Sequence, residues 1–232
     1  MSNMVIEDAL REFINASAWT HGLTQLQMDR VRREVTARSY PAGATVCPRV
    51  KPSNHWLGVV DGMLKIETVG RGGRSATFAG LPAGAWFGEG SVLKGEARPY
   101  DVVAIRDSVV AFIPRSTFLW LLAESHPFSL WLIHQLNARL GYYLALVQSF
   151  RLNDTTTQVA YCLAQLFNQD LYPNLRHQIA ISQEEIGRLS GVSRTITNRA
   201  LRELDEAGVI RIGYGTIEVL DSVALNKLAH GV

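Results

Sequence analysis

The chain is poor in the residues from which metal centres and disulfide frameworks are built. Only two of its 232 residues are cysteines, Cys47 and Cys162, and they are far apart in the sequence. Two thiolates cannot by themselves supply a structural zinc site or an all-cysteine iron–sulfur cluster. We therefore expect both cysteines to be small buried apolar residues, and we predict no metal site.

Long hydrophobic runs are also missing. No apolar run approaches the roughly 18 residues of a membrane-spanning helix, and the N-terminus lacks a signal-peptide pattern. The composition is 47% hydrophobic and 19% charged, which is typical of a globular chain with one large or two modest domains. We expect a cytoplasmic protein with no membrane partner.

The chain has little excess charge of either sign. The formal net charge is +2, and residues 154–232 carry seven Lys/Arg against nine Asp/Glu. The C-terminal third is therefore not basic overall. If it binds nucleic acid, the affinity must come from the local placement of a few arginines.

Residues 182–204 have the pattern of two short helices around a tight turn. Ser182 is suited to cap the first helix, and Glu185 completes a capping box. Gly191 lies where that helix must end, because glycine adopts the left-handed conformation without a Cβ penalty. Ser193 is suited to cap the second helix.

The second of these helices is amphipathic. Its inward side is predicted to carry Ile196, Ala200, Leu201 and Leu204. Its outward side is predicted to carry Arg194, Thr195, Asn198, Arg199 and Arg202. Such a face is suited to reading base edges in the major groove of double-stranded DNA. The alternative interpretation is an ordinary helical hairpin whose polar face is only solvated. Residues 210–212 and 216–220 alternate apolar residues around Gly213-Tyr214-Gly215, which indicates a β wing and favours a winged-helix DNA-binding domain.

In the first half of the chain, the sequence pattern changes from helical to β-rich near Tyr40. Residues 4–37 show helical periodicity, and we predict two helices, the second ending near Arg38. Short β-rich runs separated by glycine turns then follow at 56–60, 62–69, 74–81, 100–105 and 108–113. This spacing is typical of an antiparallel barrel or jelly roll. The fold class is thus α+β, with helices predicted next at 117–125 and from His126 to about Leu152.

The longest predicted helix carries an apolar stripe with alternating spacings of three and four residues. Its members are Ile133, Leu136, Leu140, Tyr143, Val147 and Phe150. This spacing is that of a coiled-coil seam, although a single core-packing stripe has the same pattern. A second copy of the same helix is the simplest cover for it, so we favour a homodimer.

A cap-rich segment at 153–157 marks the boundary to the C-terminal part, with Asp154 as the N-cap of a helix at 156–168. A polar loop containing Pro173 spans 169–177, and a short strand follows at 178–181. We expect a sensor domain with flanking helices at 1–125, a dimerisation helix and hinge at 126–153, and the winged-helix domain at 154–232.

This order of parts resembles the Crp/Fnr family of bacterial transcription regulators. The specific segments are residues 81–89 (LPAGAWFGE), which look like the phosphate-binding cassette of the family, and residues 183–195, which are similar to its recognition motif. The resemblance implies that Arg194 and Arg199 contact guanines and that Ser182, Gln183 and Ser193 contact phosphates. Thr195 stands where the family often has Glu, so the usual half-site is not expected.

The resemblance also implies an effector, whose identity stays unknown. Glu89 matches the residue that holds the ribose hydroxyl, Arg98 matches the phosphate-neutralising arginine, and Gly88 offers a backbone N–H. Tyr143 and Leu144 replace a Thr-Ser pair that contacts adenine. The interval from Glu89 to Arg98 is one residue short, and the next residue is a proline, which has no N–H donor.

These departures disfavour the family's usual cyclic AMP recognition. They leave open another cyclic mononucleotide, a cyclic dinucleotide, a different anionic ligand, or no ligand at all, with Glu89 and Arg98 forming an internal ion pair. Tyr143 could fill the base pocket or stack on a different base.

The leading function is a homodimeric transcription regulator, with RNA polymerase as a further partner if it activates. A cupin-like enzyme is disfavoured, because His55 is the single histidine between residues 40 and 115, and we predict no catalytic residues. The third is a cyclic-nucleotide-binding module that acts through protein partners.

Overall fold

The structure is a computed structural model that describes residues 3–70, 72–73, 75–152, 155–169, 171–172 and 177–230, without the side chains of 3, 149–152 and 230. Within that part of the chain no helix is long and apolar enough to cross a membrane. The same residues contain no group of three His, Cys, Asp or Glu side chains that could hold a metal ion. Cys47 and Cys162 are both free and buried, as expected.

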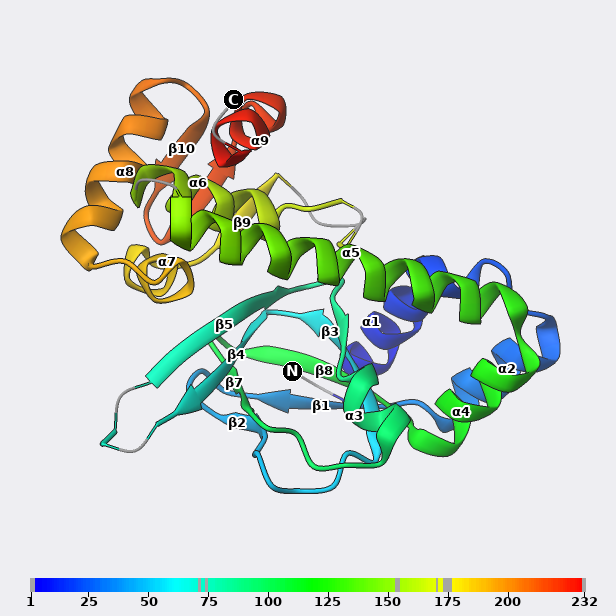
Figure 1. The fold of residues 1–232 in the computed structure, drawn as a ribbon. Coiled ribbons are helices and arrows are strands. Elements are labelled where there is room, and N and C mark those ends of the chain that lie inside the picture. Colours follow the sequence, from blue (N-terminus) through cyan, green and yellow to red (C-terminus); the bar gives the residue numbers. More distant parts are fainter. Residues whose placement is uncertain are drawn as a thin grey trace.

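The chain begins with helical segments that cover one side of the barrel (Figure 1). They are α1 (Asn3–Ala16), the 3-10 turn η1 (Ala18–Thr20) and α2 (Gln25–Glu34). The prediction that the second helix continues to Arg38 is wrong, because Thr36–Tyr40 form strand β1, which pairs with β8. The backbone hydrogen bonds offered by β8 outweigh the local helical periodicity of this segment.

The barrel is formed by two four-stranded antiparallel sheets. Its strands are β1, β2 (Thr45–Cys47), β3 (His55–Asp61), β4 (Met63–Val69), β5 (Ser75–Pro82), β6 (Trp86–Phe87), β7 (Asp101–Ala104) and β8 (Ser108–Pro114). One sheet has the order β1-β8-β3-β6, and the other has the order β2-β7-β4-β5. The five predicted strands correspond to β3, β4, β5, β7 and β8. The short strands β1, β2 and β6 and helix α3 (Glu89–Lys94) were not predicted.

An aromatic cluster joins the barrel to the helices around it. The rings of Trp56 and Trp86 stack at 4.3 Å between centroids, and Trp19 and Phe128 pack edge-on against Trp56. All four side chains are buried. Because Phe128 lies in the first turn of α5 (His126–Leu152), which follows α4 (Arg115–Glu124), the start of the long helix is held against the barrel.

From there α5 runs along the barrel to the C-terminal part (Figure 1). Its predicted apolar stripe is uncovered in the single chain, with exposed fractions from 39% at Leu136 to 61% at Ile133. Leu130 and Leu144 extend the stripe and are 46% and 63% exposed. The predicted stripe residue Phe150 has a side chain outside the described residues.

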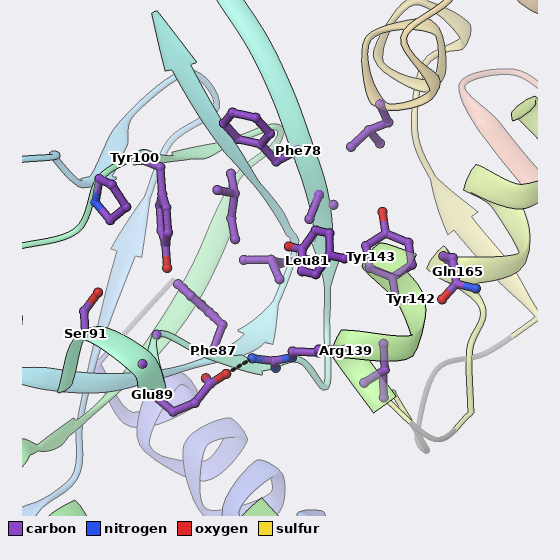
Figure 2. Close-up of a pocket in the computed structure, with 18 of the residues that line it drawn as sticks. Phe78, Leu81, Phe87, Glu89, Ser91, Tyr100, Arg139, Tyr142, Tyr143 and Gln165 are labelled. Atoms are coloured by element: carbon purple, nitrogen blue, oxygen red, sulfur yellow. Dashed lines mark hydrogen bonds and ion pairs between the residues drawn. The ribbon is translucent and has the colours of Figure 1, made fainter. Parts of the chain in front are cut away.

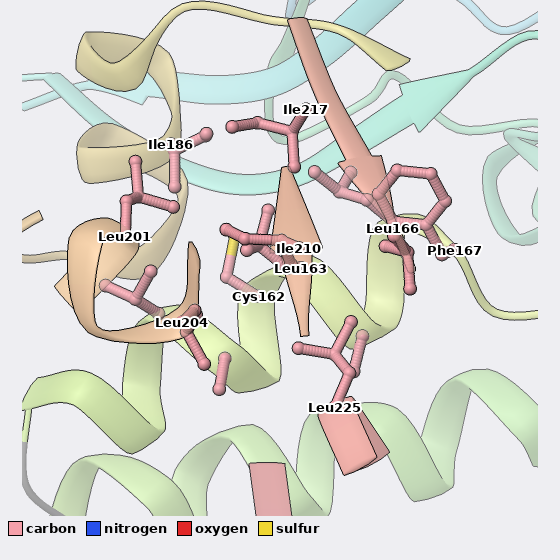
Figure 3. Close-up of a cluster of buried hydrophobic side chains, with 14 of the residues drawn as sticks. Cys162, Leu163, Leu166, Phe167, Ile186, Leu201, Leu204, Ile210, Ile217 and Leu225 are labelled. Atoms are coloured by element: carbon pink, nitrogen blue, oxygen red, sulfur yellow. The ribbon is translucent and has the colours of Figure 1, made fainter. Parts of the chain in front are cut away.

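The C-terminal part is a winged helix with one additional terminal helix. Its elements are α6 (Thr155–Leu166), β9 (Gln178–Ala180), α7 (Gln183–Ser190), α8 (Arg194–Glu206), β10 (Ile210–Gly213), β11 (Thr216–Val219) and α9 (Ser222–His230). The predicted hairpin is present, with β9 added to form a sheet of order β10-β11-β9. Helix α9 was not predicted. Its Leu225 belongs to the same buried cluster as Cys162, Leu201 and Ile210 (Figure 3).

The segment between α6 and β9 differs from the predicted polar loop. Leu171 and Tyr172 are each only 7% exposed, and they pack with the barrel core, not with the winged helix. The predicted cap Asp154 and the loop residue Pro173 lie outside the described residues.

Candidate nucleic-acid interface and effector cavity

The helix-turn-helix forms as its caps predict. The Ser182 hydroxyl accepts a hydrogen bond from the Glu185 amide at 3.1 Å, and the Ser193 hydroxyl accepts one from the Ile196 amide at 3.4 Å. Gly191 ends α7 in the left-handed conformation, with a φ of 72°. The capping box is only half formed, because the Glu185 carboxylate pairs with Arg188 and Lys65.

The two helices approach each other closely at Gly187. A Cβ on Gly187 would lie 2.8 Å from the Thr197 hydroxyl oxygen and 3.2 Å from the Val192 carbonyl oxygen. Thr197 is fully buried, and its hydroxyl donates to the Ser193 carbonyl at 3.0 Å. Sequence reasoning missed Thr197, although a glycine within the first helix signals such a close approach.

The predicted base-reading face is available to a ligand. Arg194, Thr195, Arg199 and Arg202 are exposed, and with the half-buried Asn198 they line one surface depression. Arg199 lies 3.6 Å from Glu203 in a solvent-exposed pair, which contributes little and leaves the guanidinium free to rearrange. The Asn198 Oδ1 atom is buried without a hydrogen-bond partner. Ser182 is exposed and Gln183 is half-buried at the N-terminus of α7.

A cavity of about 610 Å³ lies between the barrel, α5 and the C-terminal part (Figure 2). Its barrel side includes Ile66, Phe78, Leu81, Phe87, Gly88, Glu89 and Tyr100. Its α5 side includes Arg139, Tyr142 and Tyr143, and its C-terminal side includes Cys162, Gln165, Leu166, Leu171, Tyr172 and Leu189. The volume and the mainly apolar, aromatic lining with a few convergent polar groups are typical of a small-molecule site.

An ion pair lies at the base of this cavity. Glu89 is the first residue of α3, and Gly88 precedes it in the left-handed conformation with a φ of 87°. The Arg139 guanidinium donates hydrogen bonds to the Glu89 carboxylate and to the Trp86 carbonyl. Burial disfavours the charge of Arg139, but the Glu89 carboxylate and nearby Tyr172 and Tyr143 outweigh it, so the arginine pKa is raised. Arg139 is therefore a permanent cation facing the cavity.

Arg98 does not face the cavity. It is 5% exposed, and its Nη2 atom donates to the His55 carbonyl at 3.0 Å, while its Nε atom has no partner. A Cβ on Gly88 would lie 2.7 Å from Arg98 Nη2, so the arginine packs directly behind that glycine. Glu89 thus pairs with Arg139, and the internal pair of Glu89 with Arg98 is not formed. Arg139 was missed, although it precedes Tyr143 by four residues on the same helical face.

Both domains of the chain match domains of known proteins. Residues 37–125 match the cyclic nucleotide-binding domain, and residues 157–228 match the Crp-like helix-turn-helix domain. The chain is 29% identical over 212 residues to the cyclic AMP receptor protein of Thermus thermophilus, covering 91% of this chain and 96% of that protein. The chain belongs to the Crp/Fnr family of transcription regulators.

Two further similarities extend over most of this Crp/Fnr chain. The transcriptional regulator SdrP of Thermus thermophilus is 26% identical over 207 residues, which cover 88% of this chain and 97% of that protein. The structure of FixK2 from Bradyrhizobium japonicum has a TM-score of 0.68 at 20% identity, covering 84% and 96% of the two chains, and shows the shared fold. SdrP is a transcriptional regulator by name, and the helix-turn-helix of this family member is a DNA-binding domain.

Two tyrosines of this Crp/Fnr protein face the cavity from opposite sides (Figure 2). Burial raises the pKa of Tyr100, on the barrel side, and the pKa of Tyr143, on α5. Both hydroxyls therefore stay protonated near neutral pH and can donate hydrogen bonds. Leu144 is 63% exposed and lies outside the cavity lining, so Tyr143 alone of this pair reaches the cavity.

Proposed function

We propose that this Crp/Fnr protein is a homodimeric, sequence-specific DNA-binding regulator controlled by a small anionic effector in the cavity beside Arg139. The observation that carries the DNA-binding part is the exposed face of α8. It presents Arg194, Arg199 and Arg202 with Thr195 and Asn198 on a helix whose opposite side is buried. An arginine fork can bind guanine O6 and N7 together, and Asn can bind adenine.

Within this proposal Ser182, Gln183 and Ser193 contact phosphates and fix the register of α8 on the duplex. Thr195 cannot accept from cytosine as a carboxylate does, but its methyl group can contact thymine. The half-sites should therefore differ from those of relatives with Glu at this position. RNA polymerase is a partner if the protein activates transcription.

The exposed stripe on α5 supports the homodimer. Ile133, Leu140 and Val147 are each more than half exposed, which is unfavourable for a continuous apolar seam in water. Pairing with the same stripe of a second chain covers both seams at once, because a two-fold interface is self-complementary. The proposed dimerisation unit is residues 126–153, between a sensor unit at 1–125 and a DNA-binding unit at 154–232.

Arg139 supports an anionic effector. It is the guanidinium that lines the cavity, whereas Arg98 packs behind Gly88. The Thermus relative is named a cyclic AMP receptor, so cyclic nucleotides are the first class to test. The position of Arg98 disfavours a phosphate bound in the family's usual cyclic AMP mode, and the aromatic lining favours a base stacked on Tyr143 or Tyr100.

Selection from random duplexes with the full-length protein tests the main proposal. We expect enrichment of an inverted repeat whose half-site centres are about 10 base pairs apart, or a multiple of one helical turn. Gel shifts with the enriched duplex and a scrambled control then measure discrimination. Failure to enrich any sequence would contradict the proposal and would favour a module that acts through protein partners.

A thermal-shift screen of cyclic mononucleotides and cyclic dinucleotides tests the effector. A ligand that binds the native protein raises its melting temperature by mass action. The Arg139→Gln variant should lose that rise, whereas Lys94→Gln, which removes a cation from the exposed rim of the cavity, should keep most of it. A flat response of the wild-type protein to every compound favours a ligand-independent regulator.

A further inference from the structure

Strand β5 of the barrel contacts the DNA-binding domain directly. A Cβ on Gly80 would lie 2.6 Å from Leu166 Cδ2 and 3.4 Å from Leu189 Cδ1. The Tyr172 hydroxyl donates to the Gly80 carbonyl at 3.4 Å. Three segments of the C-terminal domain, namely α6, the α6–β9 segment and α7, thus pack on one point of the barrel, where a side chain would displace Leu166 and Met63.

An ion pair beside this contact joins the same two domains. Lys65, on β4, is 7% exposed, and its Nζ atom lies 3.0 Å from Glu67 Oε2 and 3.5 Å from Glu185 Oε1. Glu185 lies in the first turn of α7, at the end that carries Ser182 and Gln183. A buried lysine needs anionic partners, so the barrel stabilises α7 in this position and loses a partner when α7 moves away.

The contact and the effector cavity share a wall. Ile66, Gly80 and Leu81 line the cavity from the two strands that carry the contact, and Leu166 and Leu189 line it from the DNA-binding domain. A molecule that extends from Arg139 toward Leu189 therefore presses against the residues that hold the two domains together. A ligand in the cavity and the closed contact between the domains therefore compete for the same residues, so ligand binding favours the open arrangement.

We propose that the Lys65–Glu185 ion pair holds the DNA-binding domain closed over the effector cavity within one chain, and that effector binding releases α7 for DNA. This inference rests on the proposed function, because it takes the cavity as the effector site. The closed position ties the N-terminal turn of α7 to the barrel through Glu185. Release frees α7 and α8 to move together toward DNA, so opening the domains raises DNA affinity.

Cys162 reports on this opening without any effector or DNA. It lines the cavity on the C-terminal side, is 7% exposed, and burial raises its pKa to about 12, so it reacts slowly while the domains are closed. In a Cys47→Ala background, the rate of N-ethylmaleimide labelling measures how often the barrel and the DNA-binding domain separate and expose Cys162. Each variant is labelled well below its melting temperature.

Substitution at each end of the pair tests it. We expect Lys65→Glu to speed labelling about tenfold, the effect of about 1.4 kcal/mol of closing free energy. Glu185→Gln removes the partner in the DNA-binding domain, leaves the Lys65–Glu67 pair in place and should also speed labelling. The matched control Glu184→Gln removes the neighbouring exposed carboxylate, which also pairs with Arg188, and should leave labelling unchanged. An unchanged rate in Lys65→Glu or in Glu185→Gln overturns the proposal.

A neutral substitution and DNA binding give two further measurements of the opening. Gly80→Ala pushes on Leu166 and Met63 without any charge change and should also speed labelling, which covers the case in which Lys65→Glu fails to fold. Binding of Lys65→Glu to a mixed-sequence duplex should tighten several-fold, although its added negative charge by itself weakens DNA binding. Faster labelling with no tighter binding overturns the link to DNA. If the proposed function is wrong but this inference is right, no DNA sequence is selected from random duplexes, while the variants still show the expected labelling rates.

Discussion

The guanidinium of Arg139 is bonded to the carboxylate of Glu89, which lies fifty residues earlier in the chain. This pair connects α5 to the first turn of α3 at the base of the cavity. The same helix carries the exposed stripe proposed as the dimer seam. A ligand that competes for Arg139 therefore acts on the element that joins the barrel, the second chain and the DNA-binding domain.

Replacing Arg139 by Met should destabilise the protein by about 3 kcal/mol, because it leaves the Glu89 carboxylate buried without its cation. Urea denaturation of the two proteins measures the change. The control Arg211→Met removes one partner of an exposed pair with Glu218 and should cost less than about 1 kcal/mol. Equal losses of unfolding free energy in the two variants would show that the buried Glu89–Arg139 pair contributes no more to stability than an exposed pair.

Replacing Leu140 by Glu should convert the proposed dimer to monomers. The substitution puts a charge in the middle of the stripe, where Leu140 is 58% exposed in the single chain, and the two-fold axis repeats it. Sedimentation equilibrium measures the mass. The control Leu26→Glu changes a residue that is 75% exposed on α2, outside the stripe, and should leave the mass unchanged. A wild-type protein that sediments as a monomer would refute the proposed dimer interface on α5.

Replacing Arg199 by Ala should remove operator discrimination while leaving salt-sensitive nonspecific binding. A bidentate arginine–guanine contact contributes about 1–3 kcal/mol of discrimination, whereas phosphate contacts are independent of sequence. Gel shifts with specific and scrambled duplexes at two salt concentrations separate these contributions. Arg211→Ala, on the wing, is the matched arginine control. Unchanged sequence preference in Arg199→Ala would refute the base-reading assignment.

Stability should fall steeply in alkali. Burial raises the pKa of Cys162 from 9.0 to about 12, so the folded protein keeps this thiol protonated while the unfolded chain ionises it above pH 9. The contribution is complete below pH 9 and is lost as the pH rises toward 12, at up to about 1.4 kcal/mol per pH unit. Tyr161 and Tyr172, also raised to about 12, add to the loss above pH 10.

Urea denaturation of wild type and Cys162→Ala between pH 8 and 11 isolates the thiol's share. The lost contacts of the sulfur atom and the cavity it leaves give a constant offset, whereas the ionisation gives a difference in slope above pH 9. A parallel pair of curves would mean that Cys162 does not ionise differently in the two states.

Local pattern determined the helix-turn-helix, the long helix with its apolar seam and most barrel strands, because caps, glycine stops and apolar periodicity are properties of neighbouring residues. The hydroxyl caps at Ser182 and Ser193 and the stop at Gly191 formed where the sequence places them. The misplaced end of α2 and the missed strands β1, β2 and β6 have one cause, since these short segments depend on distant partners.

Tertiary structure decided the chemistry of the cavity. The cassette pattern placed Glu89 and Arg98 near each other in sequence, but only packing shows that Arg98 is directed behind Gly88 and that Arg139 faces the ligand space. Likewise the burial of Tyr172 in the barrel core and the pairing of Lys65 with Glu185 join residues more than ninety positions apart. No periodicity records such contacts, because they depend on how complete domains pack against each other.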